Sequence, residues 1–533
     1  MEYDIQFDKS GRRTFLKQVP LIVAGAHFAR AAGAEVIADS AYGKLRGADV
    51  DGIKVFKGIP YGASTDGKNR FMPPVKPAPW TGVRDALEFG RTSPQSGQPA
   101  AGAPAMGEDC LALNVFTPGI GGRGMRPVML WLHGGGFATG SASRPIYDGK
   151  NLARTGDVVV VSINHRLNVF GATYLGEAFG PEFALSGSVG IQDIVAALQW
   201  VRENIAQFGG DPNQVTIFGQ SGGGRKVATL MSMPDAKGLF HKAIIESGAV
   251  LRLTTKEDAI RYTYQLLNEL GMQGSRPRDL QAVPAAALLA ANGSVLRKMR
   301  MPEPGMVANS PMVDGVMIPG HPWDPGAPAI SANIPLLAGY ARTEETFYDR
   351  PTPESMAMTE ETLQARAAKR LGIDPAPVIE MYRKAHPDAT PWDLHILIAT
   401  DHPRGTHSRE LAKRKAQLGR APVYFYRFDW ETPEGGGHMR SPHTIDVPFV
   451  FNNVKIAGPK ISQMPEAQAL ADKVSAAWAT FARTGNPNIA ALPKWPAYSD
   501  KTRDTMLFNN VTRVVQDPDR EPRLIMEKVL KLA

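Results

Sequence analysis

The order of apolar runs along this chain restricts its fold more than any other feature. Continuous apolar runs lie at 128–133, 158–164 and 214–219, and the segment 193–208 repeats its apolar residues at helical spacing. Strands without polar alternation are typical of a sheet that is covered on both faces. A strand, a helix and a second strand in this order form a parallel pair with a right-handed crossover. The chain is therefore predicted to be α/β, with a central, mostly parallel sheet and helices on both faces.

The same pattern continues toward the C-terminus, with further apolar runs at 242–248, 334–340 and 423–428. A chain of 533 residues with 43% hydrophobic residues can bury a large core. The segments 97–107 and 298–311, which are rich in Gly, Pro or Met, are predicted to be loops. No linker interrupts residues 35–533, so we expect one large domain there.

A glycine-rich turn around Ser221 is the first candidate for a functional site. The sequence FGQSGGG at 218–224 follows a predicted strand and precedes a predicted helix. This is the G-x-S-x-G pattern in the strand–turn–helix setting that it requires, which lifts a serine Oγ above the sheet edge. Gly219 and Gly223 would let strand and helix pass close together. The alternative is a flexible loop. Because the bare pattern is common, a second motif is needed to distinguish these two interpretations.

The second motif is LHGGGF at 132–137, which directly follows the strand predicted at 128–133. Acyl transfer creates an oxyanion, and backbone N–H groups are its usual stabilisers. Gly135 and Gly136 carry no side chain that would block a substrate carbonyl. With the amide of Gly222 they would form an oxyanion hole of three donors. The two motifs in this order favour a nucleophilic Ser221 over a flexible loop.

Several longer stretches carry a resemblance to a known family. They are FKGIPYG (56–62), RFMPP (70–74), EDCLALNVFTP (108–118), WLHGGGFATGS (131–141), the segment 190–224, and AWATFARTGNPN (477–488). From about residue 40 to the C-terminus the chain resembles the type-B carboxylesterase and lipase family, which includes bacterial para-nitrobenzyl esterases and the cholinesterases. The resemblance implies the α/β-hydrolase fold and a serine carboxylesterase that hydrolyses esters through an acyl-enzyme. It implies no metal and no organic cofactor.

The resemblance also implies the partners of Ser221, an acid that orients a histidine base. GYARTEE (339–345) matches the family stretch G-x-x-x-D-E-G and implies Glu344 as the acid; Glu345 stays open as an alternative. SPHTIDVPFVF (441–451) implies His443 as the base. Ser247, in an ESG motif, matches a family position that supports the triad from behind.

Three residues depart from the family pattern. Gln220 stands where the family often has Glu, and the missing carboxylate argues against choline esters. Gly222 replaces the common Ala, which keeps the oxyanion amide but loosens the turn. Cys110 is the single cysteine, and its usual disulfide partner corresponds to Ser93. No intrachain disulfide or Cys-based metal site is therefore possible, and the apolar surroundings predict a buried structural thiol.

The first 34 residues have the layout of an export signal. Arg12 and Arg13 precede an uncharged stretch over 18–29 and the small residues of ARAAGA at 29–34. The paired arginines resemble a bacterial twin-arginine signal. The apolar run is shorter than the roughly 20 residues that span a bilayer. We therefore expect cleavage near Ala34, a periplasmic or secreted protein, and no membrane span in the mature chain.

The distribution of charge and the family resemblance limit which binding partners we expect. The net charge of +8 is scattered rather than clustered, so no nucleic-acid partner is expected. The expected substrate is a small-molecule ester, and the loop at 298–311 is a hypothesis for part of the pocket rim. Two alternatives stay open: a catalytically inactive binding or adhesion homologue of the same fold, and an amidase or lactonase that uses the same site. The sequence leaves the oligomeric state open.

Overall fold

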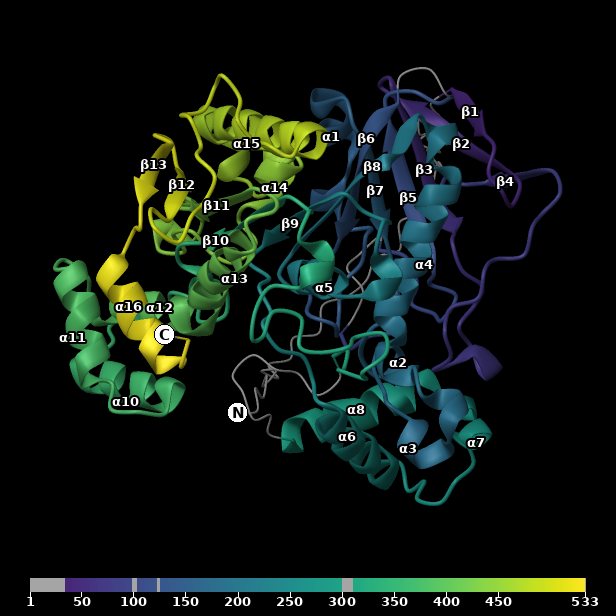
Figure 1. Ribbon diagram of the computed structural model, residues 1–533, viewed down its shortest axis with the longest axis horizontal. Coiled ribbons are helices and arrows are strands. Elements are labelled where there is room, and N and C mark those ends of the chain that lie inside the picture. The colour runs from purple at the N-terminus through teal and green to yellow at the C-terminus, as the bar shows by residue number, and fades with distance from the viewer. Residues whose placement is uncertain (1–33, 98–102, 122–124, 300–309, 533) are drawn as a thin grey trace, which may run out of the picture.

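One mixed sheet organises the computed structural model, which describes residues 34–97, 103–121, 125–299 and 310–532 (Figure 1). Its strands are Glu35–Ala38 (β1), Lys44–Val50 (β2), Ile53–Pro60 (β3), Val83–Asp85 (β4), Ala112–Thr117 (β5), Arg126–Leu132 (β6), Val159–Ile163 (β7), Gly210–Gln220 (β8), Lys242–Glu246 (β9), Leu336–Ala341 (β10), Val423–Phe428 (β11), Asp504–Phe508 (β12) and Arg513–Gln516 (β13). Within the described ranges they follow the order β1-β2-β3-β5-β7-β6-β8-β9-β10-β11-β12-β13, and β4 pairs with β2.

The centre of this sheet is parallel. The neighbours from β7 through β6, β8, β9, β10 and β11 to β12 all pair in parallel. Antiparallel pairs occur only toward the two ends, at β1–β2, β2–β3, β3–β5, β5–β7 and β12–β13. The six predicted apolar runs all form parallel strands, so the prediction of a mostly parallel sheet is confirmed.

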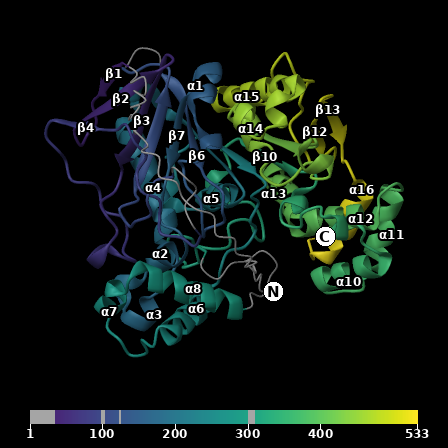
Figure 2. The ribbon, with the colours of Figure 1, turned by 180° about the vertical axis from the view of Figure 1, so that it is seen from behind.

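Helices cover both faces of the sheet (Figures 1 and 2). They are Lys150–Gly156 (α1), Asn168–Gly171 (α2), Gly176–Phe179 (α3), Val189–Asn204 (α4), Gly222–Leu230 (α5), Lys256–Glu269 (α6), Pro277–Ala282 (α7), Ala285–Lys298 (α8), Pro353–Met356 (α9), Glu360–Leu371 (α10), Ala376–Ala385 (α11), Pro391–Thr400 (α12), Thr406–Gln417 (α13), Val447–Val450 (α14), Pro465–Thr484 (α15) and Arg520–Val529 (α16). Helices α6 to α8 gather below one end of the sheet, and α10, α11, α12 and α16 gather below the other.

Strand β6 shows why the central strands are apolar throughout. Leu130 and Leu132 pack on one side with α4, α5 and α13. Met129 and Trp131 pack on the other side with α1, α14 and α15. Since successive side chains of a strand point to opposite faces, a strand between two helical layers buries every residue.

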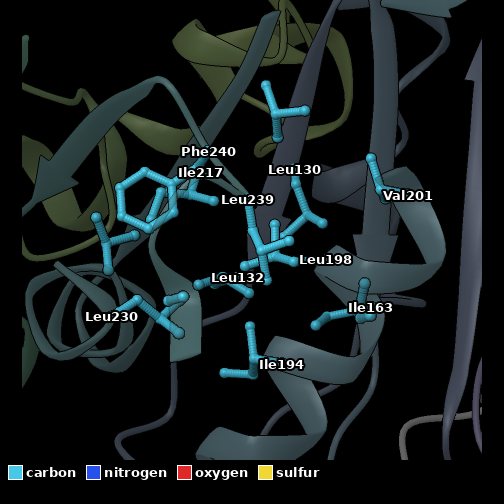
Figure 3. Close-up of a cluster of buried hydrophobic side chains, with 14 of the residues drawn as sticks. Leu130, Leu132, Ile163, Ile194, Leu198, Val201, Ile217, Leu230, Leu239 and Phe240 are labelled. Atoms are coloured by element: carbon cyan, nitrogen blue, oxygen red, sulfur yellow. The ribbon is translucent and has the colours of Figure 1, made fainter. Parts of the chain in front are cut away.

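Helix α4 forms much of one of these layers. Ile194, Leu198 and Val201 point toward Leu130 and Leu132 of β6 (Figure 3). Burying each of these aliphatic side chains contributes about 1.5–3 kcal/mol. The helix predicted over 193–208 begins earlier, at Val189, and its last residues, 205–208, form a tighter turn that ends at Gly209 with φ 76°. Only the boundaries of the predicted helix were wrong.

Two predictions fall largely outside the described residues. The export signal occupies 1–34, of which the structure describes only Ala34, and residues 300–309 of the predicted rim loop are also outside. Among the helices of the described ranges, none combines the length and the apolar character needed to cross a membrane.

Candidate active site

Ser221 sits in a strained turn between the last residue of β8 and the first residue of α5. Its backbone angles are φ 57° and ψ −121°. A positive φ is costly for a residue with a Cβ and persists only where the surroundings enforce it. The N–H of Ser221 donates to the carbonyl of Glu246 at 2.8 Å, and the N–H of Arg225 donates to the carbonyl of Ser221 at 3.0 Å. The turn is thus fixed by the neighbouring strand β9 and by the helix that it starts.

The glycines of this turn are needed for close backbone approaches. A Cβ added to Gly223 would lie 1.8 Å from the carbonyl oxygen of Leu132. A Cβ added to Gly219 would lie 2.6 Å from the same oxygen. Strand β6 therefore approaches the turn at a distance that only glycine permits. A Cβ on Gly219 would also lie 2.6 Å from the carbonyl carbon of Gly223, so β8 and α5 pass close together, as predicted.

The loop of Gly134, Gly135 and Gly136 lies directly beside the serine. A Cβ on Gly134 would stand 3.5 Å from Cβ of Ser221, and a Cβ on Gly222 would stand 2.4 Å from the amide nitrogen of Gly136. Gly135 and Gly136 have φ values of 97° and 66°. Among the described residues, the amides of Gly135, Gly136 and Gly222 donate no hydrogen bond. Three unpaired donors thus lie at one edge of the sheet.

A buried lysine holds this loop, and sequence reasoning missed it. Nζ of Lys226, on α5, donates to the carbonyl of His133 at 2.9 Å. Burial lowers the pKa of Lys226 to about 7. His133 donates from Nδ1 to the carbonyl of Gly134 at 2.8 Å, and its ring stacks on His165 at 5.1 Å. Burial, together with the charge of Lys226, lowers the pKa of His133 to about 3, so this ring is neutral.

Glu344 and His443 meet in the interior although they lie far apart in the sequence. Glu344 follows β10, and its Oε2 accepts a short hydrogen bond from Nδ1 of His443, while its Oε1 accepts from the N–H of Ala341 at 2.8 Å. Both side chains are almost fully buried. Burial opposes charge on Glu344, but His443 and then Arg404 hold the pKa of its carboxyl below the usual value. Burial lowers the pKa of His443 although Glu344 acts in the opposite direction.

The neighbouring Glu345 points elsewhere. Its carboxylate forms a short ion pair with Arg370, and its N–H donates to Oγ1 of Thr400. Burial raises the pKa of the Glu345 carboxyl, although Arg370 and Arg404 act against the shift. Of the two candidate acids, Glu344 is therefore the one that contacts His443.

Gln220 connects the serine turn to the histidine. Its Nε2 lies 3.3 Å from each ring nitrogen of His443. In the described part of the chain, no hydrogen bond joins the Ser221 hydroxyl to this ring. Hydrogen bonds at catalytic sites are often long without substrate and tighten when it binds. The structure thus brings His443 to the residue next to Ser221.

Ser247 lies behind the acid. Its N–H donates to the carbonyl of Gly339 at 2.8 Å, and its backbone has φ 50°. Its buried Oγ is near enough to Glu344 to help lower the pKa of that carboxyl, but no hydrogen bond joins the two groups within the described ranges.

A second basic residue at the site, Arg404, has no sequence signal. It lies in the turn Asp401–Gly405 between α12 and α13. Its Nη1 lies 3.4 Å from Oε2 of Glu344, and its Nη2 donates to the hydroxyl of Tyr348 at 3.3 Å. The Tyr348 ring lies 5.4 Å from the ring of His443. Arg404 is thus a charged neighbour of both groups.

In the ranges that the structure describes, no three His, Cys, Asp or Glu residues gather in a way that could hold a metal ion. Cys110 is fully buried, as predicted, and burial raises the pKa of its thiol to about 12. Ser93, at the position of the missing disulfide partner, lies close enough to this thiol to lower its pKa.

The parallel sheet, the helices on both faces and the serine turn after β8 define the fold as that of an α/β hydrolase. The model of the carboxylesterase family matches residues 34–524, and the chain belongs to this family. It is a carboxylic ester hydrolase.

Known relatives agree with this assignment. A para-nitrobenzyl esterase of Bacillus subtilis is 37% identical over 495 residues, which are 91% of this chain and 97% of the relative. A phenmedipham hydrolase of Pseudarthrobacter oxydans is 34% identical over 477 residues, 87% of this chain and 92% of the relative. A crystal structure of a Geobacillus stearothermophilus carboxylesterase superimposes with a TM-score of 0.80 at 39% identity and covers 92% of this chain and 99% of that one.

Proposed function

We propose that the chain hydrolyses carboxylic esters through an acyl-enzyme on Ser221, with His443 as the base and Glu344 as the acid that orients it. The buried contact between Nδ1 of His443 and Glu344 carries this proposal. This contact leaves Nε2 as the nitrogen that takes the proton, on a ring that touches Gln220, the residue before the serine. The contact also favours Glu344 over Glu345.

The reaction would begin when Oγ of Ser221 attacks the ester carbonyl and its proton passes to Nε2 of His443. The carbonyl oxygen becomes an oxyanion, which accepts hydrogen bonds from the amides of Gly135, Gly136 and Gly222. The C–O bond of the ester then breaks, and His443 returns the proton to the leaving alcohol. Water repeats the sequence on the acyl-enzyme and releases the acid.

Two groups would hold this arrangement. Ser247 supports Glu344 from behind and helps to keep it ionised. Lys226 fixes the carbonyl of His133 and so the start of the oxyanion loop. Both are proposed as positioning residues, because neither is placed to touch the reacting atoms.

The adjacent glutamates offer a matched pair for the test. Replacing Ser221→Ala should abolish hydrolysis of p-nitrophenyl butyrate and labelling by a serine-directed phosphonate. Glu344→Gln should lower kcat by roughly 10²–10⁴-fold, because the imidazole loses its orienting charge. Glu345→Gln should change kcat by less than about tenfold, because that carboxylate is paired with Arg370. The reverse ranking of the two glutamates would overturn the assignment of the acid.

The same assay separates the alternatives. A binding or adhesion homologue would resist the phosphonate and hydrolyse no ester. An amidase would cleave p-nitrobutyranilide faster than the matched p-nitrophenyl ester, and a lactonase would prefer a cyclic ester. We expect the open-chain ester to be the best of the three substrates.

We also propose that residues 1–34 export the chain and that residues 35–533 form the mature catalytic domain in the periplasm or outside the cell. The paired Arg12 and Arg13 before an uncharged stretch support this. Mass spectrometry of the exported protein should find an N-terminus near Ala34. An exported protein that begins at Met1 would contradict the proposal.

A further inference from the structure

Lys226, on α5, is a buried cation without a negative partner. Its side chain is 0% exposed, and within the described ranges no carboxylate pairs with it. Its Nζ donates to one carbonyl, that of His133, at 2.9 Å, and lies 5.7 Å from the centre of the Phe137 ring. An ammonium group has three N–H donors, and burying them without acceptors is costly. At least one further acceptor is therefore expected beside Nζ.

A second buried lysine shows how this fold satisfies such a group. Lys415, on α13, is 1% exposed and, among the described residues, has no acidic partner either. Its Nζ donates to two carbonyls, those of Ser331 at 2.7 Å and Ala332 at 2.8 Å. Lys226 has one such carbonyl where Lys415 has two. The comparison indicates that an acceptor other than a protein group completes Lys226.

A small cavity lies beside Lys226. Its volume is about 10 Å³, and its wall includes Lys226, His165 and the apolar side chains of Phe137, Ile191 and Ile194, all of which are buried. A buried water needs roughly 10–15 Å³ and two to four polar partners. The cavity therefore has room for one water molecule and for nothing larger.

His165 supplies an acceptor to this wall. Its Nδ1 lies 2.8 Å from the carbonyl oxygen of Arg166, which can only accept, so Nδ1 carries the hydrogen. Burial, followed by the charge of Lys226, holds the pKa of His165 well below its ordinary value, so the ring is neutral and its Nε2 accepts. In the described part of the chain this buried Nε2 has no hydrogen-bond partner. A donor and an acceptor, both incomplete, thus line one cavity.

The two residues also meet at His133, which directly precedes the glycines of the oxyanion loop. Lys226 holds the carbonyl of His133, and the ring of His165 stacks on the His133 ring at a centroid distance of 5.1 Å. The His133 ring in turn donates to the carbonyl of Gly134 at 2.8 Å. A link between Lys226 and His165 would therefore brace His133 from two sides.

We propose that this cavity binds one water molecule, which accepts a hydrogen bond from Nζ of Lys226 and donates one to Nε2 of His165, and that this water helps to hold the oxyanion loop. The binding site follows from the two side chains and the cavity alone. The effect on the loop rests on the proposed function. Lys226 and His165 act through His133 and are positioning residues.

A high-resolution crystal structure tests the binding site without any turnover. We expect a water oxygen at roughly 2.7–3.2 Å from both Nζ of Lys226 and Nε2 of His165. A dry cavity, or a direct hydrogen bond between the two side chains, would overturn the site. A bromide ion in the cavity, located by anomalous scattering after a sodium bromide soak, would show an anion site instead and would also overturn it.

Structures of three variants test the partners of the water. Lys226→Met removes the donor, and His165→Phe removes the acceptor while it keeps a ring that can stack on His133. Neither structure should contain the water. Lys415→Met, which removes the other buried lysine, should retain it. A water that stays in place in both the Lys226→Met and the His165→Phe structures would contradict the proposed partners.

Kinetics test the effect on the oxyanion loop. Lys226→Met should lower kcat for p-nitrophenyl butyrate by roughly 10–100-fold and change KM by less than about threefold, because the loop amides act on the transition state rather than on the bound ester. Inhibition by a trifluoromethyl ketone, whose adduct with Ser221 carries an oxyanion, should weaken by a similar factor. His165→Phe should change both quantities in the same direction and carries the test if Lys226→Met does not fold.

The matched control is Lys415→Met, which should leave kcat and the inhibition constant within about twofold, because its carbonyl partners lie away from the oxyanion loop. Equal losses of kcat for Lys226→Met and Lys415→Met, or an unchanged kcat for Lys226→Met, would overturn the role in catalysis. If the unaltered chain hydrolysed no ester, the proposed function would fail, while the crystallographic result would still decide the water site.

Discussion

At the scale of single residues, the site depends on backbone approaches that a methyl group would prevent. The relevant position is Gly222, where the family commonly has Ala. A Cβ built there would lie 2.2 Å from the carbonyl oxygen and 2.4 Å from the amide nitrogen of Gly136. In this chain Gly136, in the proposed oxyanion loop, occupies the space that a methyl group at position 222 would fill. Gly222 and the position of Gly136 therefore depend on each other.

Gly222→Ala should displace the oxyanion loop, although alanine is the usual family residue. The methyl group would meet backbone atoms, which cannot rotate away. If the amide of Gly136 moves out of reach of the oxyanion, kcat should fall by roughly 10²–10³-fold, the effect of losing one donor. Steady-state kinetics with p-nitrophenyl butyrate measures this. Gly320→Ala is the control, because its Cβ would enter open space. Unchanged kcat for Gly222→Ala would contradict the close approach.

The pH dependence of kcat/KM is also expected to depend on single residues. In the proposed mechanism His443 must be neutral to accept the proton of Ser221, so kcat/KM should rise with pH through the pKa of His443. Burial and the charge of Arg404 hold this pKa below its ordinary value of about 6.5. The acidic limb of the profile should therefore lie below pH 6.5 or so.

Removing the charge of Arg404 should move this limb. A positive charge disfavours the imidazolium, so Arg404→Met should raise the pKa of His443 and shift the acidic limb of kcat/KM to higher pH. Arg404→Lys, which keeps the charge, should shift it less. The profile is measured on a neutral ester, so that the charge of the substrate does not enter. A limb that stays in place or moves to lower pH would refute the electrostatic role of Arg404.

At the scale of secondary-structure elements, one buried ion pair joins the end of β7 to α4. Arg166 donates from its Nε and Nη2 to the carboxylate of Asp193, at 2.9 and 2.6 Å. Its backbone N–H donates to the same carboxylate at 3.0 Å. The side chains of Arg166 and Asp193 are only 2% and 0% exposed, so neither charge can turn to water if the other is lost.

Arg166→Met should therefore lower the free energy of unfolding by about 3–5 kcal/mol, because it leaves the Asp193 carboxylate buried without its partner. Chemical denaturation monitored by tryptophan fluorescence measures the change. Arg383→Met, which removes an exposed partner of Glu360, should cost no more than about 1 kcal/mol. The double variant Arg166→Met with Asp193→Leu should recover part of the loss. Equal losses for Arg166→Met and Arg383→Met would argue against the buried pair.

The elements also show how far sequence reasoning reaches. The parallel strands were predictable because burial on both faces makes every position apolar, as in β7. The edge strands were not, because β4 is exposed and β13 is half-exposed, and neither has an apolar run. Ser221 and the glycines could be found from local motifs, since their chemistry requires a special backbone. Glu344 and His443 needed the family resemblance, because nothing in their own spacing brings them together.

Arg404 could not be predicted from either source. It acts on Glu344 across 60 positions of sequence, and its place depends on the turn between α12 and α13. Arg225 and Lys226 follow the recognised motif, but the sequence does not show that one faces a large cavity and the other the oxyanion loop. The charges that surround the proposed triad thus follow from tertiary packing rather than from local pattern.

At the scale of the whole molecule, a cavity of about 700 Å³ is lined by parts of the chain that are distant in sequence. Arg225 begins one wall near the middle of the chain, and Lys531 closes another at its end. Helix α16, near the end of the chain, lies beside α12 below the edge of the sheet (Figure 1). The sequence as a whole has a net charge of +8 and an isoelectric point near 9.3. A small anionic substrate therefore approaches a molecule of net positive charge.

This net positive charge should make the encounter with an anionic ester sensitive to salt. The Debye length falls from about 30 Å at 10 mM ionic strength to about 8 Å at 150 mM, so salt screens the attraction of an anionic substrate before it reaches the proposed site. Raising sodium chloride over this interval should lower kcat/KM for mono-p-nitrophenyl adipate several-fold. The neutral methyl ester of the same compound should change by less than about twofold, because no net charge is attracted. An equal fall for both esters would mean that salt acts on the enzyme itself, and would contradict electrostatic attraction of the substrate.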